Sequence, residues 1–69
     1  MLTKSLHTVT AVANVARYLN AQGNAPRNAD GLAHMALTIL GYGNVDVRDK
    51  RDDTVQRCVA TCAKVIAEG

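Results

Sequence analysis

The chain has 69 residues, of which 48% are apolar and none is Phe or Trp, and it carries a net charge of +2. That length allows one small helical domain over residues 1–69, close to the lower limit for an independent hydrophobic core. No apolar run is long enough to span a membrane and no segment resembles a signal peptide, so we expect a cytoplasmic protein without membrane contact.

The apolar side chains are mostly small: eleven alanines and eight valines stand against six leucines and two isoleucines. Each buried side chain of this kind removes little area from water, at roughly 25 cal/mol per Å². A thin core in a short chain usually needs a disulfide, a metal or a second subunit. Because the chain offers no clear disulfide or metal pattern, we expect a homodimer.

The first predicted helix covers residues 3–22. Apolar residues recur at helical spacing for about five turns, from Leu2, just before this range, to Leu19. Gly23 can adopt the left-handed conformation that ends a helix, and Pro26 follows shortly after it. The β-branched run from His7 to Val12 favours a strand instead, but the longer helical pattern outweighs it.

The second predicted helix, residues 28–41, is apolar over more than half of its circumference. Asn28 is a good N-cap, and Gly41 or Gly43 can end the helix. A helix this apolar needs neighbours on several sides. The first and third helices each offer it one face of small residues, and these two faces do not cover it. We therefore expect a second chain to dock against it, with Leu37, Leu40 and Tyr42 at the dimer interface.

The third predicted helix covers residues 52–68. Asp53 and Gln56 have the spacing of a capping box, in which each side chain bonds a backbone N–H of the first turn. In the connection before the helix, Val45 and Val47 alternate with charged residues, as in a short extended segment. The fold expected is all-α, a small three-helix bundle of antiparallel neighbours completed by homodimerisation.

Four residues carry groups that could take part in chemistry: Asp30, His34, Cys58 and Cys62. Cys58 and Cys62 lie within the apolar stripe of the third helix, so core packing explains them better than half of a zinc site. Asp30 and His34 are four residues apart, but no nucleophile or oxyanion donor accompanies them. We therefore expect no catalytic residue, no metal, no cofactor and no enzymatic activity.

Five residues are candidate contacts for a partner protein: Arg17, Tyr18, Tyr42, Arg48 and Arg51. Tyrosine and arginine are the side chains that often anchor protein interfaces. With Gly41 ending its helix, Tyr42 either packs back against Leu37 or stands exposed as an anchor on the loop. The run from Asp46 to Asp53 mixes acids with bases, which suits the rim of a protein interface better than a grip on phosphates.

These features predict a small helical interaction module that binds and modulates, by inhibition or regulation, a larger protein. Size and the lack of catalytic groups would also fit an accessory protein of a phage or mobile element. The alternative is a compact helix-turn-helix regulator that binds DNA. The connection after Gly41 is longer than the usual turn, and the last helix opens with acids, so the sequence argues against nucleic acid as a partner.

Overall fold

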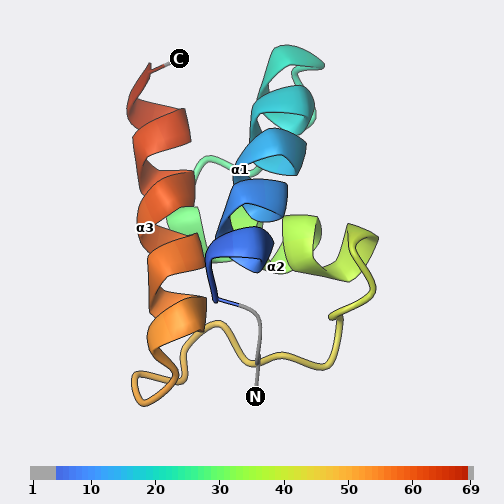
Figure 1. The fold of residues 1–69 in the computed structure, drawn as a ribbon. Coiled ribbons are helices and arrows are strands. Elements are labelled where there is room, and N and C mark those ends of the chain that lie inside the picture. The colour runs from blue at the N-terminus through green and yellow to red at the C-terminus, as the bar shows by residue number, and fades with distance from the viewer. Residues whose placement is uncertain (1–4, 69) are drawn as a thin grey trace.

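A computed structural model describes the backbone of residues 5–68 and the side chains of residues 7–68. It contains three helices in that range and no strand: α1 (Ser5–Ala21), α2 (Ala29–Ile39) and α3 (Asp53–Glu68) (Figure 1). The all-α prediction is confirmed, although residues 3 and 4 of the first predicted helix lie outside the described residues. None of the three described helices is long and apolar enough to cross a membrane.

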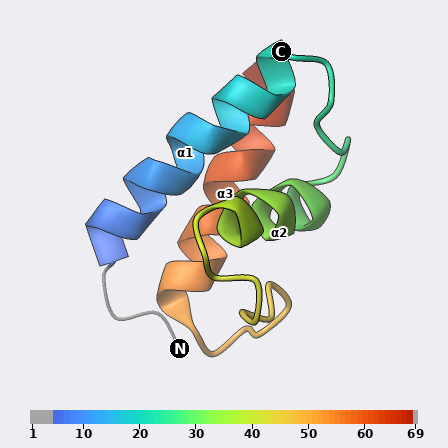
Figure 2. The ribbon, with the colours of Figure 1, turned by 90° about the vertical axis from the view of Figure 1, so that its right-hand side faces the viewer.

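The helices do not form the expected antiparallel bundle. Figures 1 and 2 show α1 and α3 side by side and running in the same direction, with α2 crossing them. With only 11 residues, α2 is about 16 Å long at 1.5 Å per residue, shorter than either neighbour. Residues 40–52 then lead the chain back to the start of α3, so α1 and α3 can run in parallel. The whole is compact, 29 × 19 × 19 Å along its principal axes.

One core lies where the three helices meet. The fully or almost fully buried apolar side chains of this core are Val12, Ala16, Leu19, Leu32, Ala33, Ala36, Leu37, Val47, Val55, Cys58, Cys62 and Val65. All but Val47 come from the helices. That valine belongs to the connection between α2 and α3, and its burial holds the connection against the helices.

Both ends of α2 are capped as the sequence predicted. The side-chain oxygen of Asn28 accepts a hydrogen bond from the backbone N–H of Gly31 at 2.6 Å. At the other end Gly41 has φ +95°, its N–H donates to the Thr38 carbonyl, and the Tyr42 N–H donates to the Leu37 carbonyl. These two bonds form a Schellman motif, which places Tyr42 just past the helix end.

The capping prediction for α3 was one residue out of place. Asp52, not Asp53, is the N-cap: its carboxylate accepts hydrogen bonds from the N–H groups of Thr54 at 3.1 Å and Val55 at 3.3 Å. Asp53 is the first helical residue, and its carboxylate pairs with Arg57 one turn later at 2.9 Å. The sequence offered two consecutive aspartates, and the buried position of Asp52 decides between them.

Candidate functional site

The connection between α2 and α3 is a series of three similar turns. Asp46, Asp49 and Asp52 each accept, through a side-chain oxygen, a hydrogen bond from the N–H two residues later. The Asp49 N–H also bonds to the Asp46 carbonyl, and the Asp52 N–H to the Asp49 carbonyl. The expected extended segment is therefore wrong, because aspartates three residues apart offer the backbone a turn in its place.

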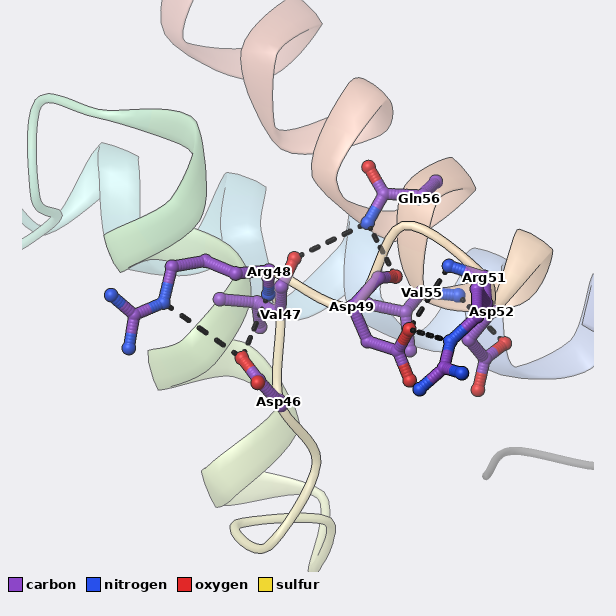
Figure 3. A network of polar contacts seen from close by, with 8 residues as sticks. All are labelled: Asp46, Val47, Arg48, Asp49, Arg51, Asp52, Val55 and Gln56. Carbon is purple, nitrogen blue, oxygen red and sulfur yellow. Dashed lines mark hydrogen bonds and ion pairs between the residues drawn. The ribbon is translucent and has the colours of Figure 1, made fainter.

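Gln56 fixes this connection to α3 (Figure 3). Its side-chain amide donates to the carbonyl of Asp49 at 2.9 Å and to the carbonyl of Val47 at 3.3 Å. Gln56 thus reaches back as a capping box would, but to carbonyls of the connection and not to the N-cap N–H. Together with the buried Val47 side chain, these bonds give the segment a defined shape although it contains no helix or strand.

Arg48 and Arg51, two of the predicted partner contacts, stand on this connection and are largely exposed. Arg48 lies 3.8 Å from the Asp46 carboxylate and Arg51 lies 3.7 Å from the Asp49 carboxylate, as Figure 3 shows. Exposed pairs of this kind contribute little stability. Each arginine therefore pairs with a neighbouring aspartate and is still exposed to solvent.

Three apolar residues at the end of α2 are exposed in full or in part. We call Ile39, Leu40 and Tyr42 the α2-end patch: Ile39 is 57% exposed, Tyr42 is 36% exposed, and Leu40 is half-buried. Leu37, by contrast, is 0% exposed and belongs to the core. Leu37 is one of the three residues expected at a dimer interface. Because the three helices of its own chain already cover Leu37, it is not exposed for contact with a second chain.

Arg17 and Tyr18 lie on α1, away from the other candidates. Both are exposed, and Tyr18 is 63% exposed. Figures 1 and 2 show that the end of α1 and the end of α2 point to different parts of the molecule. The five predicted partner contacts therefore do not form one site: Tyr42, Arg48 and Arg51 follow the end of α2, while Arg17 and Tyr18 are separate.

Asp30 and His34 line an open hollow on the surface between α2 and the connection. Val45, Val47, Asp46 and Arg48 line the opposite side. The hollow thus mixes two acids with one arginine and one histidine. Within residues 7–68, no three His, Cys, Asp or Glu side chains are grouped so that they could hold a metal ion.

The two cysteines are free thiols inside the core. Burial raises the pKa of Cys58, with a further contribution from the charge of Asp52. Burial, with a contribution from Cys58, raises the pKa of Cys62 to about 11, from an ordinary value of 9.0. Both thiols are therefore protonated at neutral pH and poorly suited to metal binding or nucleophilic chemistry.

These pKa shifts predict a loss of stability in alkali. Above pH 9 the unfolded chain loses thiol protons that the folded chain keeps. The contribution of the thiols to the free energy of unfolding is therefore full below pH 9 and is lost as the pH rises towards 11. Urea denaturation at pH 8 and pH 10 should show a smaller fall in unfolding free energy for Cys62→Ala than for the natural chain. Equal falls in unfolding free energy for the two proteins would contradict the raised pKa of Cys62.

Sequence reasoning missed two features of these surfaces. The aspartates at 46, 49 and 52 recur every third residue, which is a readable signal for consecutive turns. Ile39 lies about 200° around the helix from Leu37, so the two cannot both face the core of one chain. The sequence does not tell which of the two faces the core, because α2 is apolar nearly all round.

Comparison with protein families, with curated proteins and with solved structures found no match for this chain.

Proposed function

We propose that this chain is a small helical interaction module that forms a homodimer and binds and modulates a larger protein. The observation that carries the proposal is the α2-end patch. An isoleucine and a tyrosine stand exposed within four residues of each other, on a helix end held by a Schellman motif. Exposed aromatic and branched side chains at a fixed position are what an interface core requires.

The connection that follows the patch in the sequence also suits a protein interface. Arg48 and Arg51 lie on this connection, each beside an aspartate, so it presents both charges to solvent. Charged groups at the edge of an interface contribute specificity more than affinity. The same pairing weakens the alternative of a DNA-binding regulator, because phosphates approaching either arginine would also meet an aspartate.

Replacing Ile39 by aspartate should convert the dimer to a monomer. A charge in the middle of an apolar contact has to be desolvated without a partner, and we expect the dissociation constant to rise about 100-fold or more. Because Ile39 is 57% exposed, the monomer should keep its helical circular dichroism. Light scattering coupled to size-exclusion chromatography measures the mass over a range of micromolar concentrations.

Ala63→Asp is the matched control. Ala63 is exposed on α3, so the variant adds the same charge to another helix surface and should keep the mass of the natural chain. If the natural chain is a monomer at every concentration, the homodimer proposal is wrong. If both variants dissociate equally, the interface is not at the α2-end patch.

A further inference from the structure

Figures 1 and 2 show α1 and α3 side by side, and two shallow hollows between these helices together form a groove. Val9 of α1 and Arg57, Ala60, Thr61 and Lys64 of α3 line its first half.

Further along, Arg17 and Asn20 of α1 and Val65 and Glu68 of α3 line a second hollow. Residues seven or eleven apart share a face of a helix, as Val9 and Asn20 do on α1 and Thr61 and Glu68 do on α3. The two hollows therefore follow one another along the same side of the helix pair.

The floor of the first half of the groove is mainly apolar and made of small side chains. Val9 and Thr61 are half-buried, and Ala60 is exposed with only a methyl group between the helix backbone and solvent. Small residues let another helix approach closely, as they do between packed helices. The floor therefore has the shape and the chemistry to accept one side of a helix.

The edges of the groove are mainly basic. Arg57, Lys64 and Arg17 stand along it, and the acid among its lining residues is Glu68 at the far end. Arg57 is held by Asp53 at 2.9 Å. No ion pair within residues 7–68 engages Lys64 or Arg17. Two cations are thus available to an acidic partner along the groove: Lys64 beside its apolar first half and Arg17 in its second half.

We propose that this groove binds an acidic amphipathic helix of a partner protein. The inference rests on the proposed function and names the chemical class of the partner. Apolar residues of such a helix would lie on the floor, and glutamates or aspartates on its flanks would pair with Lys64 and Arg17.

A second copy of this chain does not fit the groove. The acids on its described helices are Asp30 on α2 and Asp53 and Glu68 on α3, and none of these helices carries an acidic flank along its length. Nucleic acid fits poorly as well, since its phosphate backbone gains nothing from an apolar floor. The occupant is therefore a foreign acidic helix.

The test uses two designed helical peptides as long as α3, labelled with fluorescein. Both carry leucines on one face; one has glutamates along both flanks, and the other has lysines in the same places. Fluorescence anisotropy at low salt should show the glutamate peptide binding about tenfold or more tightly than the lysine peptide. The preference should shrink as salt rises, because ions screen exposed charges.

Two pairs of variants locate the binding. Lys64→Glu should weaken binding of the glutamate peptide about tenfold, whereas Lys50→Glu, the same change on the connection, should weaken it about twofold or less. Ala60→Gln fills the floor and should weaken binding about fivefold, whereas Ala63→Gln on the same helix should not. Thermal melts followed by circular dichroism confirm that each variant is folded.

Three results would overturn the inference: equal binding of the two peptides, tighter binding of a mixed-sequence DNA duplex than of the glutamate peptide, or equal effects of Lys64→Glu and Lys50→Glu. Light scattering separates this failure from failure of the proposed function. Lys64→Glu leaves the α2-end patch unchanged, so a dimer that ignores the glutamate peptide would overturn the groove alone.

Discussion

Truncating Leu37 to alanine should lower the free energy of unfolding by about 2–5 kcal/mol. Leu37 is 0% exposed and among the largest fully buried side chains of the core, so its removal leaves a cavity as well as losing apolar contacts. A core in a chain of this size rarely supplies more than about 3–5 kcal/mol, so we expect much of the variant to be unfolded at 25 °C. Urea denaturation followed by circular dichroism measures the loss.

Ile39→Ala is the matched control, because it also truncates a branched side chain two residues further along α2. Ile39 is 57% exposed, and its loss should change the unfolding free energy by about 0.5 kcal/mol or less when measured in the monomeric state. If Leu37→Ala altered the mass of the protein but left its stability intact, Leu37 would be an interface residue after all, as the sequence first indicated.

Replacing Asp52 by alanine should destabilise the protein by about 1–2 kcal/mol. The substitution removes the acceptor for the Thr54 and Val55 N–H groups at the start of α3. Asp52 is also 7% exposed, so water cannot fully replace the lost bonds. Thermal or urea unfolding followed by circular dichroism measures this change.

Two variants separate the cap from the general effect of losing an acid. Asp52→Asn keeps an oxygen that can accept both bonds and should cost a few tenths of a kcal/mol. Asp53→Ala removes the exposed pair with Arg57 and should cost about 0.5 kcal/mol. If Asp53→Ala were the more damaging change, the original assignment of Asp53 as the cap would be correct.

Local structure was largely readable from the sequence, because its determinants are close together in the chain. Asn28 caps α2, and Gly23 and Gly41 take positive φ at the ends of α1 and α2, as their residue types predict. The apolar stripe of α3 likewise predicted the burial of Cys58 and Cys62. In each case a few neighbouring residues settle the conformation by their own hydrogen bonds or spacing.

The groupings of residues that could act as sites were less predictable. The sequence names Arg17, Tyr18, Tyr42, Arg48 and Arg51 as candidate contacts but does not show which of them lie together. Helix packing directs the ends of α1 and α2 to different parts of the surface. The α1–α3 groove joins residues more than forty positions apart, such as Val9 and Thr61. No local pattern encodes such a pairing.

By itself the sequence determined that residues 5–68 are all-α, where the three helices in this range lie and how most of them begin and end, since these depend on hydrogen bonds and spacing within a turn or two. Only the tertiary structure decided which side of α2 is buried. That helix is apolar nearly all round, so its periodicity allowed either Leu37 or Ile39 to face the core. Packing across α1 and α3 buried Leu37 and left Ile39 exposed, because two parallel helices cover one face of a short helix that crosses them.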